Sequence, residues 1–311
     1  MKPANPSTFE AIISKPRLDS YKAYFKTTSI EESIGLYLWN CEISSNLSHM
    51  LAFLEIALRN SIHCQMSQFK SSGTSSSMHW YDAIWGSLKP IAQNKIIEIR
   101  HDGPPNKRVL RVPPPTADEI VSRVSFGFWT SILSSLDNRF HPQNMPRIFP
   151  NHPLNANPVD WGNQKHFKKA FSPIYEFKDL RNRIAHHEPL WKFAAIMDTS
   201  VKPAVVIEHS SNNITDSIKR FKRLLGLYDD LLRSISLDLC RDMQSSSWRT
   251  QMEYLITDAG LARYRNLKHG AKPKALTINQ FARQFSYLVK ADQPVRVAKG
   301  KSFTGVFTPD G

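Results

Sequence analysis

The chain has 311 residues, of which 41% are hydrophobic and 22% are charged, a composition typical of a globular protein with one large or two small domains. It carries 41 Lys and Arg against 27 Asp and Glu, a formal net charge of +14. This excess favours a polyanionic partner, with nucleic acid first and an anionic membrane surface second; a merely solvated basic exterior is the third alternative.

The sequence argues against several other classes of protein. Its most apolar stretch, Met50 to Leu58, contains Glu55 and is far shorter than the ~20 residues of a membrane span. The N-terminus has no apolar core of the kind that a secretory signal needs. The three cysteines lie far apart and form no CxxC pair, so neither a disulfide framework nor a zinc site is expected. We expect a reduced, cytoplasmic protein with no cofactor, no metal and no membrane contact.

Capping residues and apolar spacing predict helices in the first half of the chain. Ser29 and Glu32 form a capping box, and leucines recur at spacings of three and four up to a helix end near Phe69. A second helix is expected over 80–100, with a kink or stop at Pro90, and a third over 116–136. The Ser/Gly run at 71–77 and the basic, Pro-rich segment 101–115 are expected to be loops.

The second half shows the same pattern up to residue 243. The five prolines in 137–160 predict an irregular segment, followed by a helix over 164–188 that is expected to break near Pro173. The sequence VVIEH within 201–209 is the best strand candidate, and 214–243 predicts one long amphipathic helix. We therefore predict an all-α fold, a helical bundle, for residues 1–244.

Residues 245–311 differ in composition, with eleven Lys and Arg against four Asp and Glu. Thr277 and Gln280 form another capping box ahead of a short apolar stripe, so this segment is expected to be a basic, partly helical extension. A solvated extension with no further role is the alternative.

One segment, LRNRIAHHEPLW at 180–191, combines residues that can handle a phosphodiester. Asn182 and His186 are four residues apart and share a helix face, as do Arg183 and His187. Arg181 and His186 converge only through the reach of the arginine or a bent helix end.

The end of this helix favours acid/base chemistry. Pro189 is expected to end the helix near Glu188, which places both histidines in the last turn, where the helix dipole favours protonated imidazole. A histidine that titrates near neutral pH can take a proton from a ribose 2′-OH or give one to a leaving oxygen, and an arginine can hold the phosphate. This chemistry needs no metal.

A structural interpretation of the same residues is a cap network, with Asn182 bonded to backbone and Arg183 paired with Glu188. A zinc site is disfavoured because His186 and His187 point about 100° apart on a helix, and no third ligand is evident nearby.

LRNRIAHHEPLW resembles the signature of the Abi-like (abortive infection) proteins of the HEPN superfamily, in which Arg181, Asn182 and His186 match the motif. The segments LEIALRNSIH at 54–63 and FGFW at 126–129 resemble the family's early and middle helices, so the likeness covers about 29–243. It implies an all-α HEPN-type bundle and metal-independent endoribonuclease activity. It also implies a homodimer that brings two motifs together, and a role in bacterial antiphage defence or as a toxin.

The basic extension after 244 has no counterpart in this resemblance, and Pro189 stands where some relatives carry Arg. Some HEPN proteins act as binding modules, so the motif permits cleavage without establishing it.

A shorter RN-x-x-H runs from Arg59 to His63. We interpret Glu55, Arg59 and Asn60 as a polar network that positions their helix against the motif helix; a direct contact with substrate is the alternative. The aromatic residues in 126–129 are expected to be core rather than base-stacking groups. Candidate phosphate contacts on the basic loop and the extension are Lys107, Arg108, Arg111, Lys272 and Lys274, with solvated charge as the alternative.

The leading hypothesis is an Abi-like endoribonuclease in which His186, or else His187, is the general acid/base. Arg181 is expected to bind the scissile phosphate, Asn182 to orient His186, and Glu188 to tune or orient a histidine. The expected partners are RNA, a second copy of the chain, and a phage-derived trigger or an antitoxin. The alternative is a non-catalytic RNA-binding or regulatory HEPN module.

Overall fold

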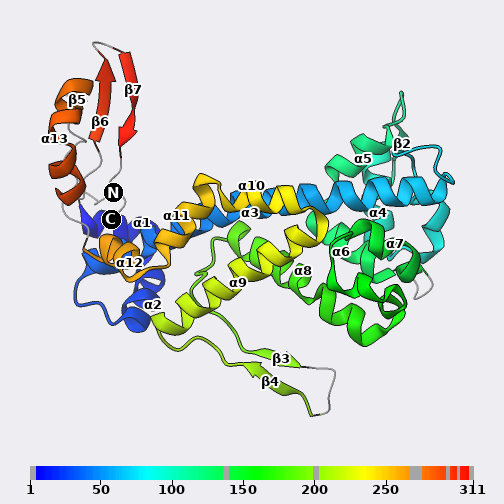
Figure 1. Ribbon diagram of the computed structural model, residues 1–311, viewed down its shortest axis with the longest axis horizontal. Helices are drawn as coiled ribbons and strands as arrows, with labels where there is room; N and C mark the ends of the chain where they lie inside the picture. Colours follow the sequence, from blue (N-terminus) through cyan, green and yellow to red (C-terminus); the bar gives the residue numbers. More distant parts are fainter. Residues whose placement is uncertain are drawn as a thin grey trace.

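A single long helix, α3 (Ile30–Lys70), runs through the molecule and contacts most of the other helices (Figure 1). The computed structural model describes residues 5–135, 140–198, 203–266, 275–291, 295–299 and 302–307. In these ranges the chain is predominantly helical, and its strands form three small sheets. The predicted all-α class is confirmed at this level.

The other helices are much shorter than α3. They are α1 (Pro6–Ile13), α2 (Lys15–Phe25), α4 (Pro90–Arg100), α5 (Ala117–Arg123), α6 (Phe126–Ser135), α7 (Phe140–Ile148), α8 (Gln164–Ala185), α9 (Ile214–Ile235), α10 (Leu237–Gln244), α11 (Ser247–Leu255), α12 (Asp258–Arg265) and α13 (Ile278–Ala291). Three 3-10 helices complete the set: η1 (Asp82–Ser87), η2 (Pro153–Ala156) and η3 (Pro158–Gly162).

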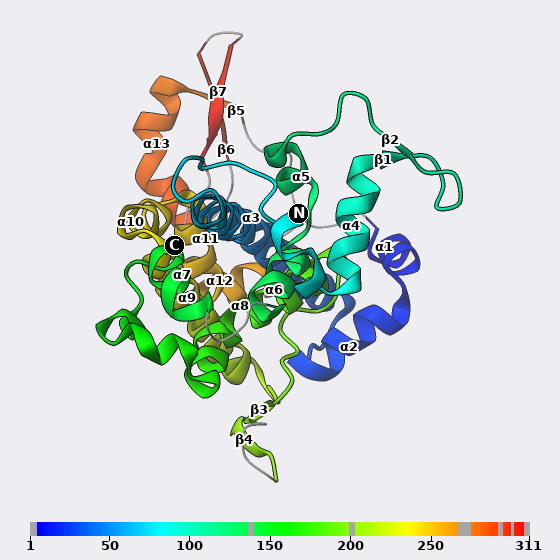
Figure 2. The same ribbon diagram turned by 90° about the vertical axis from the view of Figure 1, so that its right-hand side faces the viewer.

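The strands form two hairpins and one mixed sheet. β1 (His101–Asp102) pairs antiparallel with β2 (Val109–Leu110), and β3 (Ile196–Asp198) pairs antiparallel with β4 (Val205–Glu208). β6 (Val295–Lys299) lies between β5 (Ala275–Thr277), to which it is parallel, and β7 (Ser302–Phe307), to which it is antiparallel. The β3–β4 hairpin and the β5–β7 sheet project from the helices in opposite directions (Figures 1 and 2).

The length of α3 follows from its capping and its apolar pattern. The Ser29 side chain accepts a hydrogen bond from the Glu32 amide at 3.2 Å, as the capping sequence predicts. Apolar side chains then repeat at helical spacing, and Leu54, Leu58 and Ile62 are fully buried. At 1.5 Å per residue, the 41 residues span roughly 60 Å, long enough for different helices to pack along each half.

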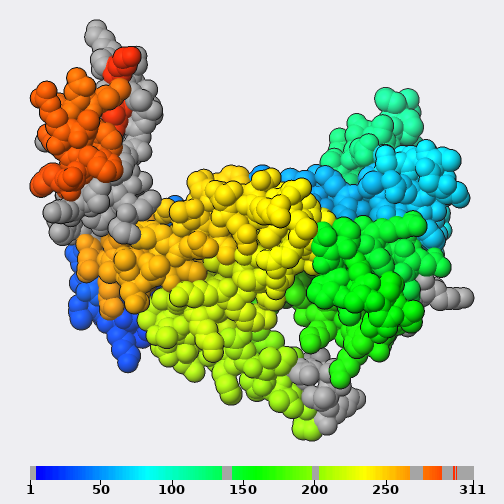
Figure 3. Space-filling model, viewed as in Figure 1, coloured from blue at the N-terminus to red at the C-terminus, as the bar shows by residue number. Residues whose placement is uncertain are grey.

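The C-terminal helices α11 and α12 belong to the main core. They pack along α3, and the Trp39 indole N–H donates to the Leu255 carbonyl at 2.8 Å. Arg249 of α11 pairs with Asp229 of α9 at 2.6 Å, a largely buried contact. In the space-filling view α10 and α11 cover much of α3 (Figure 3). The core therefore continues past residue 244, where the sequence predicts its end.

A separate small unit does exist, but it begins later. Leu276 and Leu288 form their own buried cluster, distinct from the main core. The predicted capping box at its helix is confirmed: the Thr277 amide donates to the Gln280 side chain at 2.9 Å, and the Gln280 amide donates to the Thr277 hydroxyl at 3.3 Å.

Two predictions based on proline positions were wrong. Residues 140–148, expected to be irregular, form α7 with Pro146 inside it, and α8 continues through Pro173 without the expected break. Tertiary packing outweighs local propensity here, because Phe171, before Pro173, and Ile174 and Phe177, after it, are all buried in the core.

Three other expected elements are divided. The helix expected over 116–136 breaks at Val124, which is extended, into α5 and α6. The helix expected over 214–243 breaks at Ser236, whose side chain caps α10 through the Leu239 amide. The helix expected over 80–100 is a 3-10 helix followed by α4, which starts at Pro90, and the loop expected over 101–115 contains the β1–β2 hairpin.

Truncation of the chain tests where the core ends. Removing all residues after 244 deletes four buried apolar side chains, Met252, Leu255, Ile256 and Leu261, of α11, α12 and the turn between them. Each is worth about 1.5–3 kcal/mol, a sum comparable to the whole stability of a typical domain. We expect this variant to lose its cooperative thermal transition by circular dichroism. A variant ending at Asn266 keeps those side chains and should still melt cooperatively. Equal melting of the two would contradict this assignment of the core.

Candidate functional site

The motif helix α8 ends in a Schellman arrangement. The His187 amide donates to the Ile184 carbonyl at 3.0 Å, and the Glu188 amide donates to the Arg183 carbonyl at 2.9 Å. His187 has φ 53°, a left-handed conformation in which glycine is usually found. Both imidazoles are exposed. The helix therefore ends before Pro189, as predicted, but its last residue is Ala185. His186 and His187 lie in the turn that follows rather than in the last helical turn, and the left-handed His187 does not share a helix face with Arg183.

Arg183 is a structural residue of this turn. Its guanidinium donates to the carbonyls of Pro189 and of Lys192, the latter at 3.0 Å, and its Nε lies 3.5 Å from the Glu188 carboxylate. Burial lowers the pKa of Arg183, and the charge of Glu188 opposes that effect. The pairing of Arg183 with Glu188 is the cap network expected from the sequence, so these two side chains hold the chain that follows the helix.

The end of the motif is anchored in the core. The Leu190 amide donates to the Asn40 side chain of α3 at 2.7 Å, and the Trp191 carbonyl accepts from Ser211 and Ser217 at 2.9 and 2.8 Å. The Trp191 ring is 2% exposed and packs against three aromatic rings of α2, with centroid distances of 4.2 to 5.2 Å. Arg17 of α2 also donates to the His187 carbonyl at 3.2 Å.

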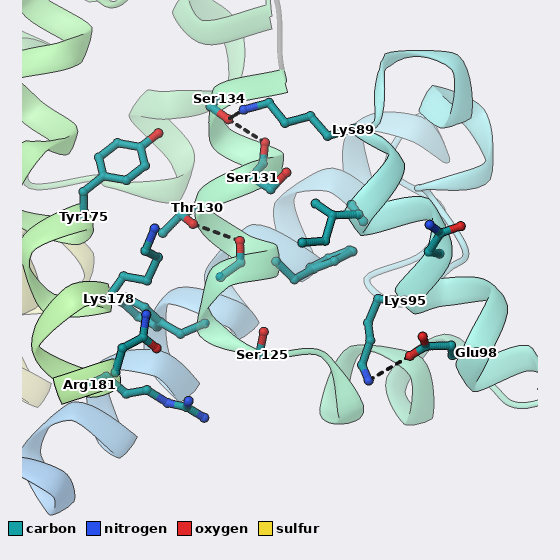
Figure 4. A pocket seen from close by; sticks show the side chains of 17 residues that line it. Lys89, Lys95, Glu98, Ser125, Thr130, Ser131, Ser134, Tyr175, Lys178 and Arg181 are labelled. Carbon is teal, nitrogen blue, oxygen red and sulfur yellow. Dashed lines mark hydrogen bonds and ion pairs between the residues drawn. The ribbon is translucent and has the colours of Figure 1, made fainter. Parts of the chain in front are cut away.

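Arg181 and Asn182 line a groove of about 960 Å³ between α4, α6 and α8. Figure 4 shows Arg181, Lys178 and Tyr175 on the α8 wall, and Lys95 and Glu98 on the α4 side, with hydroxyl groups of α6 between them. His186 and His187 are not among the residues that line it. The structure thus brings Arg181 and Asn182 together in a groove and leaves the histidines exposed just beyond its α8 wall.

The second RN segment lies close to Arg181. Burial raises the pKa of the Glu55 carboxyl on α3; the charges of Arg181 and Arg59 and the Phe126 amide, which donates to it, oppose this rise. Arg59 also donates from Nε to the Asn60 side chain at 3.3 Å. The Glu55 carboxyl of α3 therefore interacts with the amide that begins α6 and with the charge of Arg181. The role of Glu55, Arg59 and Asn60 in positioning the motif helix stays a prediction.

The other candidate RNA contacts lie elsewhere. Lys107, Arg108 and Arg111 are on or beside the β1–β2 hairpin, and Arg111 is paired with Asp102 at 3.0 Å. Lys272 and Lys274 lie outside the described residues.

Two further expectations concern the aromatic segment and metals. Phe126, Phe128 and Trp129 are between 0 and 6% exposed, which confirms the core interpretation. No group of three or more metal-ligating side chains occurs among the residues that the structure describes.

His63 is a buried member of a polar cluster at the surface, and its hydrogen bonds settle its tautomer. The Trp80 indole N–H donates to its Nδ1 at 2.9 Å, and because an indole can only donate, the proton of neutral His63 is on Nε2. That nitrogen lies 3.2 Å from the Ser77 hydroxyl and 3.3 Å from Asp118. In this tautomer His63 cannot take a proton from Ser77, so the cluster is not an activated-serine site.

The sequence did not reveal the cationic wall of the groove. Lys178 precedes Arg181 by three residues on one helix, and extending the helical face backwards from the motif would have found it. Lys89 and Lys95 come from α4, almost ninety residues earlier, and no sequence pattern connects them to the motif.

Comparisons with protein-family models, curated proteins and solved structures find no match to this chain. The functional argument therefore depends on the geometry of the motif.

The backbone at His187 allows its structural and chemical roles to be separated. We expect His187→Gly to raise the free energy of unfolding by about 0.5–1 kcal/mol, because glycine removes the strain of a left-handed residue, less the entropy it adds to the unfolded chain. His186→Gly is the matched control: His186 has φ −91°, so glycine should lower stability there. Urea denaturation measures both, and a destabilising His187→Gly would contradict the assigned cap.

The His63 cluster predicts a loss of stability in acid. Burial lowers the pKa of His63, an effect that Asp118 opposes, so the folded state keeps the imidazole neutral. The unfolded chain binds a proton near pH 6.5. Stability from this site is thus complete above about pH 6.5 and lost as pH falls through the lower folded pKa. His63→Asn, which keeps an acceptor for Trp80, should flatten the profile of melting temperature between pH 7 and pH 5. An unchanged slope would contradict this.

Proposed function

We propose that this protein is a metal-independent endoribonuclease of the Abi-like, HEPN type. The observation that supports it most is a division of roles within LRNRIAHHEPLW. Arg183, Glu188, Leu190 and Trp191 are engaged in holding the helix end. The groups suited to phosphodiester chemistry, the side chains of 181, 182, 186 and 187, are exposed to solvent.

The proposed reaction is an internal transesterification. One histidine accepts the proton of a ribose 2′-OH, and the 2′-oxygen then forms a bond to phosphorus. The bond from phosphorus to the 5′-oxygen breaks, and a protonated histidine supplies the proton to that oxygen. The products are a 2′,3′-cyclic phosphate and a 5′-hydroxyl. Arg181 stabilises the additional negative charge of the transition state.

Asn182 and His186 lie one helical turn apart, since the His186 amide donates to the Asn182 carbonyl at 3.0 Å. This spacing suits Asn182 to orient His186 or the bound phosphate. His186 is our first choice for the acid/base group and His187 the second. A single α8 supplies one Arg181 with one histidine pair, and a homodimer that joins two such helix ends would supply a second set.

The proposed setting is the bacterial cytoplasm, in antiphage defence or as a toxin, with RNA as substrate and a phage-derived trigger or an antitoxin as regulator. Among the described helices none has both the length and the apolar character required to cross a bilayer. The alternative function, a non-catalytic RNA-binding or regulatory module, is favoured by the net charge of +14 and by the basic groove beside the motif.

Cleavage in the presence of EDTA tests the proposed chemistry. Removing a general acid/base group typically costs about 10²- to 10⁴-fold in rate, and we expect His186→Ala to lose cleavage of end-labelled RNA by that amount while still binding it. The wild-type fragments should carry a 2′,3′-cyclic phosphate or its hydrolysis product.

His209→Ala, which removes an exposed histidine that follows β4, is the matched control and should cleave normally. Equal cleavage by wild type and His186→Ala would remove His186 from the mechanism. Intact RNA with the folded wild type, also after addition of phage-infected cell extract, would favour the binding module.

A further inference from the structure

The groove beside the motif carries an excess of positive charge. Four cationic side chains and one acidic one, Glu98, line it; Glu98 is 3.1 Å from the Lys95 ammonium, and Asp179, next to the lining, is 3.7 Å from the Lys178 ammonium. The cations come from two walls, with Lys89 and Lys95 on the α4 side and Lys178 and Arg181 on α8. A concave surface with this excess of positive charge concentrates anions.

Two of the cations contact other side chains that line the groove. The Lys89 ammonium donates to the Ser134 hydroxyl at 2.8 Å, so it spans from the start of α4 to the C-terminal end of α6 (Figure 4). Lys178 lies with its ammonium 6.0 Å from the centre of the Tyr175 ring. Along α8, Lys178 precedes Arg181 by about 4.5 Å of helix rise. A strand whose phosphates bind along this wall would therefore run towards the helix end that carries the histidines.

Apolar surface is present in the same groove. The Tyr175 side chain is 37% exposed and that of Ile91 is 75% exposed, although most large apolar residues of α6 and α8 are buried. Positive charge along a groove together with an accessible aromatic ring is the pattern by which proteins bind single-stranded nucleic acid: cations contact phosphates and bases stack on the ring.

We propose that the groove between α4, α6 and α8 binds a single-stranded segment of the RNA substrate and directs it to Arg181. Lys89, Lys95 and Lys178 contact phosphates, and an unpaired base stacks on Tyr175. The identity of the polyanion as RNA rests on the proposed function. Contacts of this kind hold RNA without reading its sequence, and stacking requires an unpaired base, so the groove prefers a single strand to a duplex.

Binding can be measured without cleavage in full-length protein carrying His186→Ala. The probe is a fluorescein-labelled 12-nucleotide RNA of mixed sequence, followed by fluorescence anisotropy in EDTA at several salt concentrations. We expect Lys178→Gln and Lys89→Gln each to weaken binding and to reduce the slope of log Kd against log salt by about 0.7, the value for one phosphate contact on a single strand. Lys169→Gln, an exposed lysine of α8 outside the groove, should change neither quantity.

Tyr175 tests the stacking contact. Tyr175→Ala should weaken binding about fivefold or more, whereas Tyr175→Phe should bind like the parent protein because it keeps the ring. The same RNA annealed to its complement should bind more weakly than the single strand, and the difference should shrink in Tyr175→Ala. Melting temperatures of all variants confirm that they are folded.

Several outcomes would overturn the groove assignment. The first is no RNA binding by the parent protein, and the second is unchanged binding by the groove variants. The third is loss of binding only in a double variant, Lys107→Gln with Arg108→Gln. The fourth is displacement of the RNA by AMP at equal concentration, which would indicate a mononucleotide site. Failure of the proposed function gives a different result. RNA held in the groove but never cleaved by the wild type would leave this assignment intact, and cleavage that is insensitive to the groove variants would refute the groove alone.

Discussion

Burial of Trp191 is the constraint on which the candidate site depends. Its ring is enclosed by aromatic residues of α2, and the backbone around it is bonded to Asn40 of α3 and to serines before and within α9. The chain leaving α8 must therefore turn sharply after Ala185, and Arg183 stabilises that turn by binding the carbonyls of Pro189 and Lys192. Without these contacts, the helix end that carries the exposed histidines would be free to fray. Here they are attached to a turn that is fixed on both sides, which is the rigidity that acid/base chemistry requires.

The motif thus contains two interleaved sets of residues with different physical roles. One set, Arg183, Glu188, Leu190 and Trp191, is buried or paired and holds the helix end, while the other, at 181, 182, 186 and 187, is exposed at or beside the groove. Glu55 of α3 interacts with the charge of Arg181 and accepts a hydrogen bond from the amide that begins α6. A substitution of Leu190 or Trp191 would therefore alter the proposed chemistry only indirectly, by releasing the helix end.

Local patterns in the sequence were sufficient to predict the helical class, the long helix ending near Phe69, the capping residues Ser29 and Thr277, and the approximate end of α8. These features depend on residues within one or two turns of each other. The errors arose where distant contacts decide the outcome: Pro146 and Pro173 lie within helices that packing maintains, and α11 joins the core through contacts to α3 and α9. The groove could not be predicted for the same reason, since Lys89 and Lys178 meet only in the folded chain.

The contact between Trp39 and Leu255 joins residues that are 216 positions apart. Bringing such distant segments together carries a loop-closure entropy that local helices do not, and it slows folding. During synthesis the first half of α3 emerges long before α11 and α12 can cover it. The helix end at 186–187 also emerges before the serine of α9 that helps to hold it, Ser217. The anchored turn is therefore completed only after Ser217 has left the ribosome, and a shorter nascent chain does not yet display the assembled site.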